Sequence, residues 1–226
     1  MAQEGKSVSS SVTATFVFTD LVDSTATAAR VGPEAAEELR QTHFRLLRGA
    51  VTASGGTEVK NLGDGLMVVY SSPRRALSGA VGMAQAIDHH NRSAAEPLGV
   101  RIGVSAGEVV EEDDDYFGDP VVEAARLCAA AQGGQILAAE LVRLMVGRHA
   151  TQSFVDRGPF ELKGLPGPVD VVEVVWEPAT PITGSTINVN RVSLAEMMNS
   201  ITKYTTMVMG SLSTAFRLFI TAISTS

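Results

Sequence analysis

The stretch Thr15-Phe-Val-Phe-Thr-Asp20-Leu-Val-Asp-Ser-Thr25 places an aspartate at the end of an apolar run. Apolar residues alternate with smaller ones up to this point, which predicts a half-buried strand that ends at Asp20. A second stretch, Lys60-Asn-Leu-Gly-Asp64-Gly-Leu-Met-Val-Val-Tyr70, has two strand-like runs around Gly63-Asp64-Gly65. It predicts a hairpin with Asp64 at its tip.

If the strand and the hairpin pair side by side, the carboxylates of Asp20 and Asp64 converge. Hard divalent cations such as Mg2+ and Mn2+ take oxygen ligands and often bind one or two carboxylates together with phosphates. Taken alone, Asp20 would be a strand-end cap and Asp64 an ordinary turn residue, because Asp-Gly is common in hairpins. Together with Lys60, the two aspartates predict a metal site.

The composition indicates a globular protein. The chain has 226 residues, of which 45% are hydrophobic and 19% charged, so it has room for one domain with an extension. A net charge of -7 argues against a nucleic-acid partner. The single cysteine, Cys128, excludes an internal disulfide, and the first ten residues lack an apolar core, so we expect no secretory signal there. We expect a cytoplasmic protein, alone or as the cytosolic part of a membrane-associated one.

Periodicity and turn residues predict the order of the elements. Helices are expected at about 33–51, 73–91, 120–130 and 140–146, and strands at 12–18, on both sides of the Asp64 turn, and at 100–110, 136–138, 160–162 and 169–175. The acidic tract 111–115 is predicted to be a loop. This order predicts an α+β fold in which helices cover a mostly antiparallel sheet.

The composition changes near Glu177-Pro178, so we predict a polar lead at 1–10, a folded domain at 11–177, a linker at 178–190 and a helical tail at 191–226. The tail has one apolar seam, formed by Leu194, Met198, Ile201, Thr205, Val208, Leu212, Ala215 and Phe219. A helix packed on its own domain or on a second copy is the favoured interpretation. A helix lying on a membrane surface is the alternative.

Three motifs resemble the catalytic core of class III nucleotidyl cyclases of the bacterial, actinobacterial type: Asp20 with Ser24-Thr25, Lys60-x-x-Gly-Asp64-Gly, and Asp115-Tyr-Phe-Gly-Asp-Pro-Val-Val-Glu-Ala-Ala-Arg126. The resemblance spans about Ser11 to Trp176 and includes Phe160-Glu-Leu-Lys-Gly164. It implies a ferredoxin-like (βαββαβ) fold. It also implies the cyclisation of ATP or GTP to a 3′,5′-cyclic monophosphate with release of pyrophosphate.

The resemblance assigns the metal and phosphate contacts. It implies that Asp20 and Asp64 bridge two Mg2+ or Mn2+ ions, with Leu21 also at the metals. The backbone N–H groups of 21–25 and the hydroxyls of Ser24 and Thr25 are expected to bind phosphate oxygens. Capping of the following helix by Ser24 or Thr25 is the alternative use of the same groups.

The resemblance also implies which purine is read. Lys60 and Asp115 match the adenine pattern of the family, because adenine N1 accepts a hydrogen bond from an ammonium and its exocyclic amine donates one to a carboxylate. ATP is therefore the expected substrate. The alternatives are a solvated strand lysine for Lys60 and a solvated loop charge for Asp115.

Arg126 matches the family arginine that stabilises the charge of the phosphates in the transition state, and its alternative is a surface ion pair. Lys163 lies where the family supplies a further phosphate contact. Val122 stands where many members have an asparagine that orients the ribose, and valine cannot hydrogen-bond a ribose oxygen. Glu123 could substitute for this asparagine from the next position, but its side chain points about 100° away from that of Val122 around the helix. We expect a slower enzyme.

In the family, each active site takes residues from two chains, and this sequence contains both halves. The resemblance therefore implies a two-fold symmetric homodimer and an inactive monomer. Val122 motivates an alternative, a catalytically weak nucleotide-binding or regulatory module. A diguanylate cyclase is disfavoured, because Gly55-Gly56-Thr57-Glu58 lies in the wrong place relative to Asp64.

Overall fold

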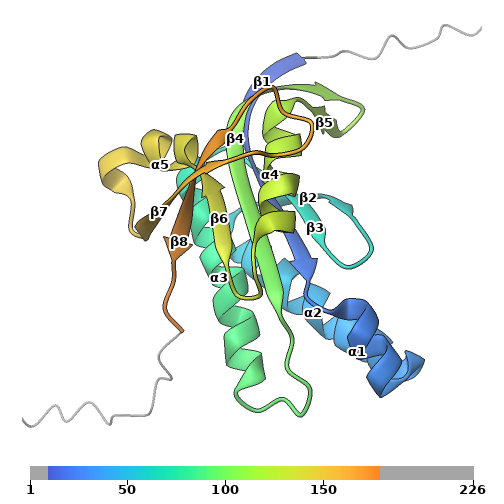
Figure 1. Cartoon of the computed structure of the whole chain (residues 1–226). Helices are drawn as coiled ribbons and strands as arrows, with labels where there is room; N and C mark the ends of the chain where they lie inside the picture. The colour runs from blue at the N-terminus through green and yellow to red at the C-terminus, as the bar shows by residue number, and fades with distance from the viewer. Residues whose placement is uncertain (1–9, 179–226) are drawn as a thin grey trace, which may run out of the picture. The chain divides into compact units, whose positions relative to one another are not determined.

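A computed structural model describes residues 10–178 of the chain (Figure 1). Residues 1–9 of the predicted lead, 179–190 of the predicted linker and the predicted tail at 191–226 lie outside the described residues. The helices are α1 (Ser24–Val31), α2 (Pro33–Ser54), α3 (Pro73–Asn91), α4 (Asp119–Ala130) and α5 (Glu140–Val146), with a 3-10 turn at Gly147–His149. Among these described helices, none has the length and hydropathy needed to span a bilayer.

The strands form one sheet. They are β1 (Ser10–Leu21), β2 (Thr57–Asn61), β3 (Leu66–Tyr70), β4 (Val100–Glu112), β5 (Asp115–Phe117), β6 (Ile136–Ala139), β7 (Ser153–Phe160) and β8 (Val169–Val175). Their order is β2-β3-β1-β4-β6-β8-β7, and β5 pairs with β4. Only the β4–β6 pairing of the described sheet is parallel. The predicted α+β class and the βαββαβ order of β1 to β4 are confirmed.

Helices cover both faces of the sheet (Figure 1). The alternation along β1 sends Val17 into the larger core, which it shares with Leu47 of α2 and Leu77 of α3. Phe16, one residue earlier, points to the opposite face and belongs to a smaller core with Ala124 of α4. Helix α4 thus lies on the face opposite to α2 and α3.

Helix α4 packs unusually close to β4, because β4 contains Gly103. A Cβ atom at this position would lie 2.2 Å from both the carbonyl oxygen of Ala124 and the amide nitrogen of Cys128. Only a residue without a side chain allows this contact. The glycine therefore sets the distance between the helix and the strand.

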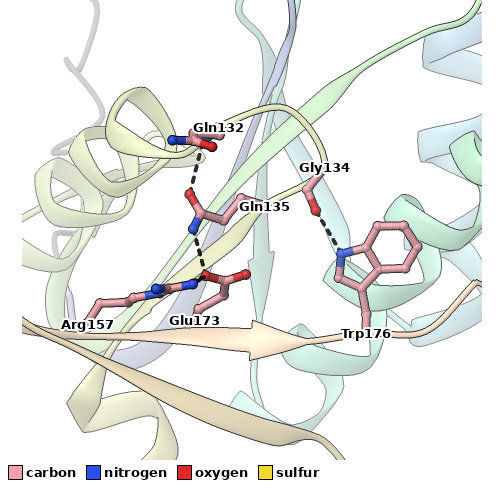
Figure 2. Close-up of polar contacts among 6 residues, drawn as sticks. All are labelled: Gln132, Gly134, Gln135, Arg157, Glu173 and Trp176. Carbon is pink, nitrogen blue, oxygen red and sulfur yellow. Dashed lines mark hydrogen bonds and ion pairs between the residues drawn. The ribbon is translucent and has the colours of Figure 1, made fainter.

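Polar contacts fix the loop between α4 and β6 against β7 and β8 (Figure 2). Gln135 Nε2 donates to Glu173 Oε2 over 2.7 Å, and Arg157 Nε donates to the same oxygen over 2.8 Å. The indole N–H of Trp176 donates to the carbonyl oxygen of Gly134 over 2.8 Å. These bonds hold the segment that follows α4.

Two predictions about strands are wrong. The acidic tract is not a loop, because β4 continues to Glu112 and β5 begins at Asp115. Asp113 and Asp114 form the turn between them, with φ values of 49° and 61°. Aspartate tolerates this left-handed conformation, so a two-residue hairpin forms within the charged run. The strand expected at 160–162 lies earlier and ends at Phe160.

Gly103→Ala is expected to lower the free energy of unfolding by about 1–3 kcal/mol, because the new methyl group forces α4 away from β4. Gly82→Ala is the matched control, since a Cβ at position 82 of α3 meets its nearest neighbour, Ala50 Cβ, at 3.6 Å. It should be neutral or stabilising by up to about 1 kcal/mol. Urea unfolding measures both. Equal stability of the two variants would contradict the packing argument.

Candidate active site

The structure brings Asp20 and Asp64 together, as the sequence predicts. The loop at 62–65 connects β2 to β3 and lies against the end of β1. The Leu21 amide donates to the carbonyl oxygen of Asp64 over 3.1 Å, and the Leu66 amide donates to Thr19 Oγ1 over 2.9 Å. A Cβ at position 65 would lie 1.7 Å from the carbonyl oxygen of Thr19, so this approach requires Gly65.

Both carboxylates line one cavity of about 290 Å³. Its walls are formed by Phe18, Thr19, Asp20, Leu62, Asp64, Arg101, Ala125, Cys128 and Ala129. Burial raises the pKa of Asp20, and the neighbouring Asp64 raises it further, whereas the hydrogen bond from Arg101 opposes both effects. Ser24 Oγ donates to Asp64 Oδ2 over 3.0 Å. The cavity therefore concentrates negative charge.

Arg101 is a site residue that the sequence reasoning missed. It lies directly opposite Asp20 in the β1–β4 register. Its Nε and Nη2 atoms contact Asp20 Oδ2 at 2.6 Å and 2.5 Å. Pairing β1 with β4 would have placed this arginine beside the aspartate, but the sequence motifs do not show which strands pair.

The two carboxylates fit Mg2+ or Mn2+. Within residues 10–178, no group of three or more His, Cys, Asp or Glu side chains is arranged to hold a metal ion. Mg2+ needs no such protein cage, because it usually keeps several waters and binds one or two carboxylates together with substrate phosphates. Two aspartates in one open cavity meet that requirement.

The predicted phosphate contacts lie beside this cavity at the start of α1. Asp23 is the N-cap residue, with φ 54° and ψ 28°, and its side chain makes no capping bond. The Leu21 amide is already bonded to Asp64, so it is not a free donor for phosphate in this structure. Ser24 and Thr25 form the first turn, and the Ser24 hydroxyl bonds Asp64, so Ser24 does not take the alternative role of a helix cap.

The two predicted purine-reading residues form an ion pair on the surface. Lys60 of β2 and Asp115 of β5 are 55 residues apart, and Lys60 Nζ lies 2.6 Å from Asp115 Oδ2. The hydrogen bond from Lys60, and then the one from the Tyr116 amide, lower the pKa of Asp115. An ammonium and a carboxylate thus stand side by side.

Arg126 and Lys163 form a third group. Arg126 Nε donates to the carbonyl oxygen of Lys163 over 3.0 Å, so the loop after β7 contacts α4. Glu123 does not replace the missing asparagine, because Ser105 Oγ on β4 donates to its Oε1 over 2.9 Å. Burial raises the pKa of Glu123.

The cavity that holds Asp20 and Asp64 is lined by none of Lys60, Asp115, Arg126 and Lys163. In the described part of one chain, Asp20 and Asp64 therefore line the cavity, whereas the Lys60–Asp115 pair and Arg126 with Lys163 lie outside it.

His43 of α2 is a buried histidine close to Asp64. Its side chain is 0% exposed, and neither ring nitrogen has a hydrogen-bond partner in the described part of the chain. Burial lowers its pKa to about 4, and the nearby Asp64 offsets only part of this effect. The imidazole is therefore neutral in the folded state at physiological pH.

Comparisons with known proteins point to one family. The family model of the adenylate and guanylate cyclase catalytic domain matches residues 7–176. An uncharacterized protein of Mycobacterium tuberculosis is 40% identical over 166 residues, which are 74% of this chain and 42% of that protein. A pH-sensitive adenylate cyclase of the same species is 31% identical over 177 residues, 75% of this chain and 42% of that enzyme.

A solved structure agrees with this match. The adenylate/guanylate cyclase/hydrolase from Silicibacter pomeroyi has a TM-score of 0.67 and 27% identity, and the alignment covers 75% of this chain and 100% of that one. The predicted class III cyclase fold is therefore confirmed. The chain spans about two fifths of the length of the two curated mycobacterial relatives.

His43 is expected to make stability depend on pH. Its folded-state pKa of about 4 lies below the ordinary value of about 6.5, so its contribution is complete above pH 6.5 and is lost as the pH falls toward 4. Between pH 7.5 and pH 5 we expect a loss of about 2 kcal/mol that is absent in His43→Leu. Urea unfolding at both pH values measures the difference. Parallel losses in both proteins would show that another group is responsible.

Proposed function

Because the chain belongs to the family of adenylate and guanylate cyclase catalytic domains, we propose that it is an adenylate cyclase that converts ATP to 3′,5′-cyclic AMP and pyrophosphate. The observation that carries the proposal is the convergence of Asp20 and Asp64 in one cavity. Two adjacent carboxylates with only one arginine beside them are electrostatically unfavourable, because the two negative charges repel each other. They become favourable when cations join them.

Asp20 and Asp64, with Leu21, are the residues that would hold two Mg2+ or Mn2+ ions. Such ions promote ionisation of the ribose 3′-hydroxyl and neutralise the departing pyrophosphate. Asp20 is placed by the end of β1 and Asp64 by the bond between its carbonyl and the Leu21 amide. The first turn of α1, with Ser24 and Thr25, supplies donors for phosphate oxygens beside the carboxylates.

Lys60 and Asp115 support ATP as the substrate. Their contact places a hydrogen-bond donor, the Lys60 ammonium, next to an acceptor, the Asp115 carboxylate. Adenine presents an acceptor at N1 to the ammonium and a donor at its exocyclic amine to the carboxylate. Guanine presents the opposite order, an acceptor at O6 and a donor at N1, so the choice of purine depends on which edge atom faces Lys60 and which faces Asp115. With Lys60 at N1 and Asp115 at the exocyclic amine, the arrangement that the family resemblance implies, the pair favours adenine.

Arg126 and Lys163 would act on the phosphates. Arg126 Nε donates to the Lys163 carbonyl oxygen, and this bond restricts the orientation of the guanidinium. A guanidinium held in this way is suited to stabilise the charge that develops on phosphate oxygens.

The separation of the three groups supports a homodimer. In a two-fold arrangement, the cavity of one chain would face Lys60, Asp115 and Arg126 of a second copy, so that two complete sites form at the interface. Exposed apolar side chains lie near both halves: Leu62 at the cavity is 46% exposed, and Phe117 beside Asp115 is 53% exposed. A second copy would cover such residues.

The experiment is cyclic nucleotide formation by the purified chain with Mn2+ and either ATP or GTP, over a range of protein concentrations. We expect cyclic AMP from ATP, a rate with ATP at least about 10-fold above that with GTP, and specific activity that rises with protein concentration. Asp64→Asn should lower the rate by about 100-fold or more, because it weakens metal binding. Asp170→Asn, an exposed aspartate of β8, is the control and should retain full activity.

The second candidate is a nucleotide-binding module with little turnover. Val122 favours it, because the family asparagine is missing and Glu123 is directed to Ser105. Binding of ATP without cyclic product from either nucleotide would support this candidate and contradict the adenylate cyclase.

A further inference from the structure

We infer that Arg101 is a positioning residue that sets the divalent-cation affinity of the cavity. It holds the Asp20 carboxylate until a cation replaces the contact between Arg101 and Asp20. The inference rests on the proposed function, since it assumes that Asp20 and Asp64 are the metal ligands. It concerns how the site is occupied before catalysis.

Arg101 contacts a carboxylate oxygen of Asp20 that a bound cation would also use. Both Nε and Nη2 contact the same oxygen, Asp20 Oδ2, at 2.6 Å and 2.5 Å. Charge-assisted hydrogen bonds of this length use the lone pairs of that oxygen. A metal ion that bridges through Asp20 therefore has to share or replace the contacts of Arg101.

Arg101 cannot easily leave the cavity when this happens. Its Nη1 atom donates to the carbonyl oxygen of Ala129 over 3.2 Å, in the last turn of α4. Its own carbonyl oxygen accepts a bond from Cys128 Sγ over 3.3 Å. The negative end of the α4 dipole also favours a cation at this position. Release of Asp20 thus leaves the guanidinium within the cavity wall.

The charge of the cavity then depends on Arg101. Among its lining residues in the described structure, Asp20 and Asp64 contribute -2 and Arg101 contributes +1, which gives -1. Without the guanidinium the sum is -2. Because cation affinity increases with the negative charge of the ligand set, and like charges repel at short range, Arg101 should weaken metal binding. The side chains of Arg101 and Asp20 are 36% and 24% exposed, so water screens part of this effect.

The test is isothermal titration of the full chain with Mn2+ alone at pH 8, without nucleotide. Arg101→Gln should bind Mn2+ about 10-fold more tightly than the wild type, within the 5- to 150-fold range of typical coupling between bound groups. Arg101→Lys keeps the charge but loses the forked contact, so its affinity should lie between the two. Asp20→Asn in either background should abolish the tight binding.

Arg157→Gln is the matched control. Arg157 also pairs with a carboxylate across two strands, through Glu173, but it does not line the cavity. It should bind Mn2+ like the wild type. Urea unfolding of each variant checks that the fold is retained, and Arg101→Lys keeps the test valid if Arg101→Gln unfolds.

The outcomes separate the two claims. Unchanged or weaker Mn2+ binding in Arg101→Gln, with binding that still depends on Asp20, would overturn the role of Arg101 and leave the metal site intact. Absence of aspartate-dependent Mn2+ binding in every protein would overturn both the inference and the metal site of the proposed function.

Discussion

The contact between the 62–65 loop and the end of β1 is the constraint on which the candidate site depends. Gly65 lies so close to the Thr19 carbonyl that a side chain at this position would collide with it. Two hydrogen bonds beside it fix the loop: the Leu21 amide donates to the Asp64 carbonyl oxygen, and the Leu66 amide donates to the Thr19 hydroxyl. This geometry holds two carboxylates together at an electrostatic cost, which Arg101 reduces and a divalent cation would offset.

The larger core and the candidate site lie on opposite faces of the sheet. The larger core lies under α2 and α3, whereas α4 covers the opposite face with the smaller core (Figure 1). The cavity takes part of its wall from α4, and Arg126 lies on the same helix. Gly103 allows α4 to approach β4, so the position of Arg126 and the wall of the cavity depend on one packing contact. In a single chain the cavity is lined by none of Lys60, Asp115 and Arg126, which is why we propose that a second copy completes the site.

Much of the fold could be predicted, because alternation along β1 and the helical spacing of α2 and α3 are local signals. Asp20 and Asp64 were predictable for a related reason: Asp20 lies at the end of the apolar strand β1, and Asp64 lies in the turn before the apolar strand β3. The hairpin at Asp113 could not be predicted, because a run of acidic residues usually indicates a solvated loop. Here the pairing of β4 with β5 outweighs that tendency. Arg101 could not be predicted without the register of β1 and β4, which pairs it with Asp20, 81 residues earlier. The contact of Glu123 with Ser105 likewise depends on how α4 packs on β4.

The most direct test of the shared site is to mix two inactive variants. Asp20→Ala removes a proposed metal ligand, and Arg126→Ala removes the proposed phosphate contact, so each homodimer should be inactive. Mixed in equal amounts, half of the dimers would be heterodimers with one intact site of two, and activity should recover to about a quarter of the wild-type value. If the mixture stays as inactive as its components, although the chains exchange, each site is built from one chain and the account is wrong.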